Sequence, residues 1–163
     1  MTSDSAEARG RLLPLEEFRQ SLPPGARLIG IDVGTKTLGL AVSDVTRMIA
    51  SSLVTLRRRK LALDLQDLLA VATKRGVGGF VIGLPLNLDG SAGPRAQATR
   101  AFARSLAKTV PLPILLWDER LSTIAAERTL LEADASRRRR AAVIDTVAAV
   151  WILQGALDRM NCA

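Results

Sequence analysis

The residues best suited to chemistry in this chain are acids that lie on separate predicted elements. Asp32 lies inside an apolar strand, Asp118 and Glu119 follow another strand, and Asp145 lies within a largely apolar helix. An Asp is disfavoured inside a strand, and a buried, unpaired carboxylate either costs several kcal/mol or takes up a proton. Acids in such positions are typical of a site that binds a cation.

Each acid also has an ordinary structural interpretation. Asp32 could be a surface acid beside a hairpin. The acids at 118–119 could form a salt bridge with Arg120 or lie at the N-terminus of the next helix. Asp145 could pair with one of the arginines at 137–140. These alternatives stay open because sequence spacing does not show which side chains meet.

Composition excludes most other catalytic chemistries. The chain has no histidine and a single cysteine, Cys162, which excludes His-based triads, His-ligated metals, and disulfides or Cys-based zinc sites within one chain. Carboxylates without His or Cys suit a hard cation, Mg²⁺ or Mn²⁺. Two such ions can stabilise both the attacking water and the leaving oxygen of a phosphodiester. The acids therefore favour a nuclease.

The charge of the chain indicates a polyanionic partner. Lys and Arg total 23 against 16 Asp and Glu, so the net charge is +7 on 163 residues, which favours nucleic acid. Aromatic residues make up 3% and Tyr is absent, so a platform for stacked single-stranded bases is not expected. No apolar run reaches the ~20 residues of a membrane span. Residues 1–9 lack the apolar core of a signal peptide, so we expect no membrane partner and a cytoplasmic protein.

The cations that we expect to contact nucleic acid lie on several elements. Four consecutive arginines begin the last predicted helix, where cations oppose the helix dipole by about 0.3–1 kcal/mol each. Phosphate contacts would explain why that cost is tolerated. A second basic run at 57–60 follows a predicted strand, and any such run can simply be a solvated face. The candidate nucleic-acid ligands are Lys36, Arg95, Arg120, Arg137, Arg138, Arg139 and Arg140.

Two adjacent strands with a tight turn between them position Asp32. Apolar residues alternate over 28–33 and 38–42, and residues 34–36 form the turn. On the opposite face, Asp32 is preceded by Gly30 and followed by another glycine, so little bulk surrounds the carboxylate. Glycine in a strand usually marks a close approach by backbone or ligand. This pattern predicts a bound cation or phosphate at Asp32.

The rest of the chain predicts an α/β domain. We expect further strands at 48–56, 80–84 and 114–117, and helices at 61–75, 94–110, from Ser122 onward and at 137–160. Strands joined by short turns must be antiparallel, whereas strands separated by helices are most simply parallel. The sequence therefore predicts a mixed five-stranded sheet flanked by helices. Residues 1–26 are expected to form a partly disordered N-terminal extension, and residues 27–160 the catalytic domain.

A loop rich in Gly, Pro, Asn and Asp spans residues 85–93. It follows a buried strand and precedes a helix that begins with Pro94. Because it lies beside the predicted site, we expect it to be a mobile lid that faces the substrate.

Four blocks of sequence resemble one known family. They are GIDVGTKTLGLAVSD at 30–44, GLPLNLDGSAGPRAQ at 83–97, DERLST at 118–123 with Glu127-Arg128, and IDTVAA at 144–149 with Leu153-Gln154. In this order the blocks resemble the YqgF, or RuvX-like, family of pre-16S rRNA nucleases, over about residues 28–158. That family is similar to Holliday-junction resolvases of the RuvC type. The resemblance therefore implies a ribonuclease H-like fold.

The resemblance also implies an activity and a site. It implies metal-dependent cleavage of phosphodiesters that matures the 5′ end of 16S rRNA. Carried over residue by residue, Asp32, Glu119 and Asp145 become the catalytic and metal-binding acids, with Asp118 as a fourth catalytic candidate. In the RuvC pattern the fourth strand ends near a catalytic Glu, whereas here that strand ends without an acid. The second ligand must then come from the next strand or from Asp89 in the loop.

Four functions remain open at this stage. The first is an endonuclease acting on structured RNA such as pre-16S rRNA, as a monomer or homodimer. The second is a resolvase that cuts both strands of branched DNA and is therefore normally a dimer. The third is an actin-like ATPase, suggested by Asp32-Val-Gly-Thr35, although such enzymes need two of these domains around one nucleotide. The fourth is a non-catalytic RNA-binding assembly factor.

Overall fold

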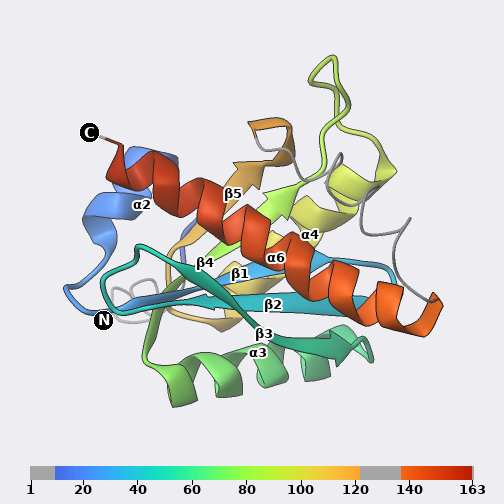
Figure 1. Ribbon diagram of the computed structural model, residues 1–163, viewed down its shortest axis with the longest axis horizontal. Coiled ribbons are helices and arrows are strands. Elements are labelled where there is room, and N and C mark those ends of the chain that lie inside the picture. Colours follow the sequence, from blue (N-terminus) through green and yellow to red (C-terminus); the bar gives the residue numbers. More distant parts are fainter. Residues whose placement is uncertain (1–9, 122–136, 163) are drawn as a thin grey trace, which may run out of the picture.

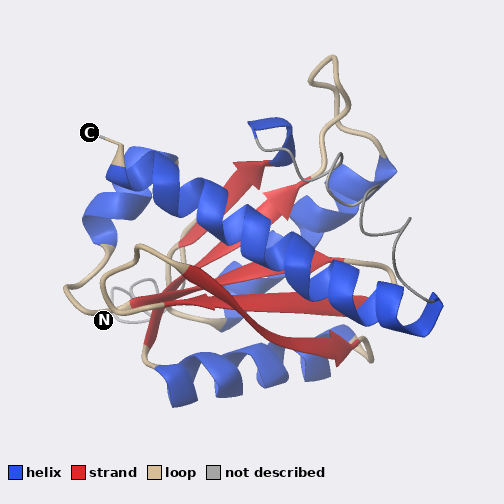
Figure 2. Ribbon diagram, viewed as in Figure 1, coloured by secondary structure: helices blue, strands red, loops and turns tan. Residues whose placement is uncertain are grey.

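A mixed five-stranded sheet forms the centre of the protein (Figures 1 and 2). The computed structural model describes residues 10–121 and 137–162, with side chains in the second range described from residue 146 onward. The strands are β1 (Arg27–Val33), β2 (Thr37–Ser43), β3 (Ala50–Arg57), β4 (Val77–Leu84) and β5 (Ile114–Asp118), in the spatial order β3-β2-β1-β4-β5. The first three strands pair antiparallel, and β1, β4 and β5 are parallel. The predicted mixed α/β sheet is confirmed.

Helices cover both faces of the sheet (Figure 1). The helices are α2 (Leu15–Ser21), α3 (Leu61–Arg75), α4 (Pro94–Thr109) and α6 (Arg137–Asn161), and a 3₁₀ turn, η1 (Glu119–Leu121), follows β5. One apolar core joins the sheet to α3 and α4, and a second joins it to α2 and α6. The helix predicted from Ser122 onward lies outside the described residues, as do residues 1–9.

Strand β1 shows how alternation divides the two cores. Ile31 contributes to the α3–α4 core, whereas Leu28 contributes to the α6 core. Gly30 also faces α6, because an ideal Cβ there would lie 2.7 Å from Leu153 Cβ and 2.9 Å from the Ala149 carbonyl oxygen. The predicted close approach at this glycine is therefore present, and the approaching element is the backbone of α6.

Local sequence signals account for most element boundaries. Helix α3 ends at Gly76, which adopts a left-handed φ of 65°, and Pro94 is the first residue of α4, as expected for these residue types. Strand β3 begins at Ala50, two residues later than predicted, because Asp44 caps the preceding turn. The Asp44 carboxylate accepts hydrogen bonds from the backbone N–H groups of Met48 (2.8 Å) and Ile49 (3.0 Å).

The segment before the sheet packs against it. The Leu13 N–H donates to the Ile114 carbonyl at 2.9 Å, and the Ile114 N–H donates to the Arg11 carbonyl at 2.8 Å. Phe18 of α2 is completely buried against β4, where an ideal Cβ at Gly79 would lie 3.1 Å from the Phe18 ring. This packing explains why β4 begins three residues earlier than predicted, through glycines with little intrinsic strand preference. Within the described chain, we find no helix with the length and hydropathy of a membrane span.

Candidate active site

Asp32 lies near the carboxyl end of the central strand β1 and is 6% exposed. Alternation from Ile31 and Val33, which face the α3–α4 core, places the Asp32 side chain on the α6 face. Its partner on β2 is Gly39. On β4, Ile31 pairs with Ile82, so the position next to Asp32 is Gly83. The carboxylate is therefore flanked by glycine on both neighbouring strands.

Glu119 is brought to the same face of the sheet by the turn that follows β5. It is the first residue of η1 and is half-buried. An ideal Cβ on Gly83 would lie 2.7 Å from Glu119 Oε1 and would also collide with the Ile152 side chain of α6. The absence of a side chain at Gly83 thus leaves the space that the Glu119 carboxylate occupies. Asp32 and Glu119 flank the end of β4 on the face that α6 covers.

Asp118 makes a different set of contacts although it precedes Glu119. Its Oδ2 accepts hydrogen bonds from Arg120 Nη2 (2.7 Å) and Nε (3.1 Å), and its Oδ1 accepts the Arg120 backbone N–H (2.9 Å). These bonds, the side-chain bond from Arg120 above all, lower the pKa of the Asp118 carboxyl below its usual value. The ion pair with Arg120 that the sequence left open is therefore present at Asp118.

The third predicted acid, Asp145, lies on the described backbone of α6, but its side chain is outside the described part. The side chains of Arg137, Arg138, Arg139 and Arg140 are likewise outside it. Among the residues with described side chains, no three acids, histidines or cysteines lie close enough to hold a metal ion. The described part of the site therefore consists of Asp32 and Glu119.

The other predicted nucleic-acid ligands lie around the carboxyl end of β1 and β4. Lys36 is exposed in the turn between β1 and β2, and Arg95 is exposed in the first turn of α4. Arg120 is also exposed, although its guanidinium already bonds Asp118. A phosphate that contacts Arg120 would have to share it with that carboxylate.

The basic run at 57–60 divides into a half-buried residue, Arg58, and exposed neighbours, a division that the run itself does not indicate. Arg58 Nη1 donates to the Gly34 carbonyl at 2.9 Å, and Arg58 Nε lies 3.6 Å from the Asp64 Oδ2 atom. The Arg58 guanidinium also lies 5.6 Å from the centre of the Phe102 ring. Arg58 thus joins the turn after β1 to both α3 and α4. No spacing rule signals this role, because its partners come from three different elements.

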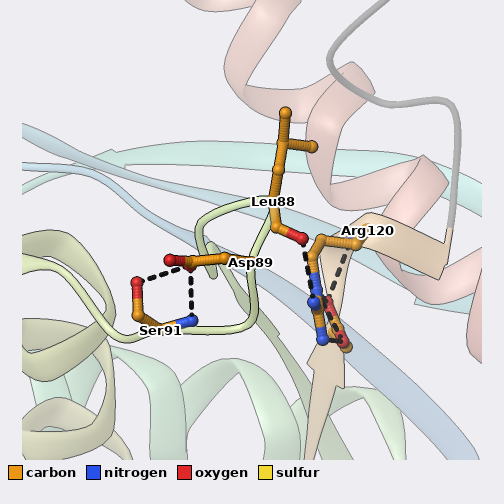
Figure 3. Close-up of polar contacts among 5 residues, drawn as sticks. Leu88, Asp89, Ser91 and Arg120 are labelled. Atoms are coloured by element: carbon orange, nitrogen blue, oxygen red, sulfur yellow. Dashed lines mark hydrogen bonds and ion pairs between the residues drawn. The ribbon is translucent and has the colours of Figure 1, made fainter.

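The loop between β4 and α4 is held by its own side chains (Figure 3). The Asp89 Oδ1 atom accepts hydrogen bonds from the Ser91 backbone N–H (2.9 Å) and hydroxyl (2.6 Å). These bonds lower the pKa of Asp89 below its usual value, with Ser91 as the largest cause. The Asp89 carboxylate therefore contributes to loop structure, which weakens its candidacy as the second metal ligand.

The sheet order, the buried acid on its central strand and the helix across that face form a ribonuclease H-like arrangement of the RuvC type. Thermus thermophilus RuvC in complex with a Holliday junction substrate has a TM-score of 0.54 at 14% identity, covering 85% of this chain and 98% of that chain. A second Thermus thermophilus RuvC structure gives a TM-score of 0.52 at 13% identity, covering 83% of this chain and 97% of that chain. At these identities the similarity concerns the fold.

The family follows from sequence comparison. A family model for RuvX, described as Holliday junction resolvase, matches residues 26–159. Relatives named "Putative pre-16S rRNA nuclease" include the following three. The protein of Rhodobacter capsulatus is 60% identical over 146 residues, 90% of this chain and 92% of that protein. Those of Paracoccus denitrificans and Rhizobium etli are 59% and 56% identical, covering 90% and 92% of this chain and 93% and 92% of their own lengths. The chain belongs to the RuvX family.

Proposed function

We propose that this protein is a metal-dependent endonuclease that processes the 5′ end of pre-16S rRNA during ribosome biogenesis. The observation that carries the proposal is the placement of two carboxylates, Asp32 and Glu119, on one face of the sheet on either side of Gly83. The names of close relatives support the substrate class. The net charge of +7 suits a nucleic acid.

The carboxylate oxygens of Asp32 and Glu119 fit a hard divalent cation. Both side chains offer carboxylate oxygens, which Mg²⁺ and Mn²⁺ prefer. Gly83 leaves free the space that the Glu119 carboxylate needs. Asp32 is nearly buried, which favours pairing its charge with a cation. When bound, such an ion lowers the pKa of a water molecule and stabilises charge on the leaving oxygen. The task of Asp32 and Glu119 is to hold and orient the ion.

Asp145 is our proposed third ligand, on the basis of helix geometry. The Ala149 carbonyl lies over Gly30, and Asn161 at the other end of α6 donates to the Arg47 carbonyl beyond β2. The helix therefore runs, towards its N-terminus, in the direction in which β1 runs from Gly30 to Asp32. Residue 145 precedes Ala149 by four residues, close to one helical turn. We expect it to share the sheet-facing side of α6 at the level of Asp32.

Exposed cations would bind the phosphates around these acids. Lys36 and Arg95 lie on loops and helix ends next to the carboxyl ends of β1 and β4. We propose that they act with Arg120 and the arginines at 137–140. Phosphate contacts fix register without reading sequence, so structured RNA would be recognised largely by shape.

Branched DNA is the second candidate substrate. The family model is described as a Holliday junction resolvase, and the fold is that of Thermus thermophilus RuvC. A resolvase must cut two strands symmetrically and would act as a homodimer. A monomer that cuts structured RNA would fit the first proposal.

One cleavage assay tests the proposal. The purified protein would be incubated with pre-16S 5′-leader RNA, and separately with a four-way DNA junction, in Mn²⁺, Mg²⁺ or EDTA. We expect metal-dependent RNA cleavage that is lost in Asp32→Asn and retained in the control Asp67→Asn, a partly exposed acid on α3 paired with Arg59. Native mass would be measured on the same samples. Equal cleavage by Asp32→Asn, or cleavage in EDTA, would contradict the proposed chemistry. Cleavage of the junction by a dimer, with none of the RNA, would favour the resolvase.

A further inference from the structure

Leu88 is presented to solvent at the tip of the loop between β4 and α4. Its side chain is 95% exposed, the largest value for any large hydrophobic side chain in the described part of the chain. Single exposed apolar residues are ordinary on protein surfaces. Leu88 differs because its loop is held in one shape and because that loop is bonded to the turn that carries Glu119.

The loop is internally braced. The Asn87 N–H donates to the Ser91 carbonyl (3.0 Å), the Gly90 N–H donates to the Asn87 carbonyl (2.8 Å), and Asn87 Nδ2 donates to the Ser91 hydroxyl (2.9 Å). Gly90 adopts a φ of 88°, which few other residues tolerate. Together with the Asp89–Ser91 bonds, these contacts brace the tip of the loop at 85–93, which we call the arm. The mobile lid that its composition suggested stays a prediction.

Arg120 fixes the arm relative to the acids. Its Nη1 donates to the Leu88 carbonyl at 3.4 Å, while its other nitrogens bind Asp118. The same guanidinium packs on the loop, since an ideal Cβ at Gly90 would lie 3.3 Å from Arg120 Nη1. Figure 3 shows the Leu88 side chain directed away from Asp89, Ser91 and Arg120. Because Arg120 directly follows Glu119, the η1 turn connects the loop tip at Leu88 with the candidate site.

We propose that Leu88 is an apolar wedge that packs against an unstacked base of the structured RNA beside the cleavage site, and that Arg120 is the residue that positions it. Proteins that deform nucleic acids insert Leu, Ile or Met side chains between base steps. The inference rests on the proposed function, because it states how the same site selects structured RNA.

The surroundings of Leu88 favour a nucleic acid over a protein partner. The neighbouring residues Asn87, Asp89 and Ser91 are polar, so Leu88 is the single apolar side chain within residues 87–91. A protein interface would need a broader apolar core. Arg95, exposed where the arm joins α4, can bind the phosphate that flanks a displaced base. An apolar side chain at the loop tip and a cation at the start of α4 would together suit one unstacked base step and its phosphate.

Base unstacking can be measured without cleavage. A pre-16S 5′-leader hairpin with 2-aminopurine at successive positions would be titrated with the Asp32→Asn protein. We expect the 2-aminopurine fluorescence to rise at one base step near the cleavage site. With the double variant Asp32→Asn/Leu88→Ala, the fluorescence at that step should stay low. Leu88→Met should keep the signal. The control is Ile49→Ala, which removes a 63% exposed apolar side chain from the loop between β2 and β3, at the opposite end of the sheet. An equal rise with Leu88→Ala would overturn the proposal.

Cleavage assays separate this inference from the proposed function. In the active protein, Leu88→Ala should slow cleavage of the paired leader by roughly 5- to 100-fold, the range expected from one lost base contact. The rate should recover on a leader with an abasic site at the same step. If the wild type cleaves in Mn²⁺ and Leu88→Ala cleaves equally well, only the wedge is wrong. If the wild type cleaves no RNA in any metal, the proposed function is wrong. If Leu88→Ala cleaves the free leader as the wild type does but binds purified ribosomal proteins less tightly, Leu88 contacts a protein and the wedge is again wrong.

The positioning role of Arg120 has its own readout. Arg120→Met should shift or broaden the position of the 2-aminopurine signal although Leu88 is intact. Arg120→Lys should not restore it, because a single ammonium cannot bond Asp118 and the Leu88 carbonyl as the planar guanidinium does. If Arg120 only stabilises the fold, Arg120→Met would lower the melting temperature and leave the responding base unchanged. That result would contradict the positioning role.

Discussion

Asp118 and Glu119 are adjacent in the chain, but their carboxylates have different neighbours. Asp118 is bound by Arg120, and Glu119 lies over Gly83 on the α6 face. We therefore expect Glu119→Gln to reduce cleavage by at least about 100-fold, the scale of losing one group that stabilises charge in the transition state, with little change in stability. Asp118→Asn should cost about 0.2–1 kcal/mol of stability, because its ion pair is partly exposed, and should reduce cleavage far less. Cleavage rates and urea unfolding of both variants check this prediction, and equal loss of activity would contradict it.

Arg58 is the cation whose removal should affect folding most among those with described side chains. Its ion-pair partner Asp64 is 2% exposed, and the Asp64 Oδ2 atom has no hydrogen bond. Arg58→Met would leave that carboxylate buried without its cation, and we expect a loss of about 1–3 kcal/mol in the free energy of unfolding. Arg58→Met combined with Asp64→Leu should recover much of the loss, because it removes the stranded charge. Urea unfolding measures both, and strictly additive losses would show that the two residues do not interact.

At the level of elements, close packing at glycines places the acids. At Gly83, an added Cβ would meet Glu119 Oε1 and the Ile152 side chain. We expect Gly83→Ala to displace Glu119 and to reduce cleavage at least about tenfold, while overpacking costs about 1–3 kcal/mol of stability. The control is Gly93→Ala, where the nearest atoms would be 3.6 Å away and the backbone is extended. Full activity in a folded Gly83→Ala protein would mean that the Glu119 carboxylate does not need its present position.

The parts of the fold that the sequence predicted are those set by local chemistry. Residue type and spacing predict the β1–β2 hairpin, whose Asp32 face is lined by glycines. They also predict the end of α3 at Gly76 and the start of α4 at Pro94. Glu119 could not be separated from Asp118, because η1 ends the strand alternation just after β5. The role of Arg58 depends on contacts between elements distant in sequence. Tertiary packing, which spacing does not encode, decides both cases.

For the whole molecule, positive charge should govern the affinity for RNA. If the four arginines at 137–140 each contact a phosphate, changing all four to Gln should weaken binding. The slope of log K against log salt should flatten by ~0.7–0.9 per lost contact. Stability should be unchanged or slightly higher, because cations no longer oppose the N-terminal dipole of α6. Filter binding at several salt concentrations gives the slope. An unchanged slope would show that the run is a solvated face.

A metal ion bound by all three acids would connect β1, the turn after β5 and helix α6. Substituting Asp145 therefore tests whether these elements share one metal site. If Asp145 is a ligand together with Asp32 and Glu119, the metal-free protein brings like charges together, and Asp145→Asn should leave its stability level or raised. The stabilisation by Mg²⁺ or Mn²⁺ should shrink, because the ion binds the folded state more weakly. Cleavage should fall by orders of magnitude while RNA binding persists. If Asp145 instead pairs with a buried arginine, the same change strands a cation and should cost roughly 3–5 kcal/mol. Thermal melts of both proteins in EDTA and in each metal distinguish the two cases, since a large destabilisation in EDTA contradicts the ligand assignment.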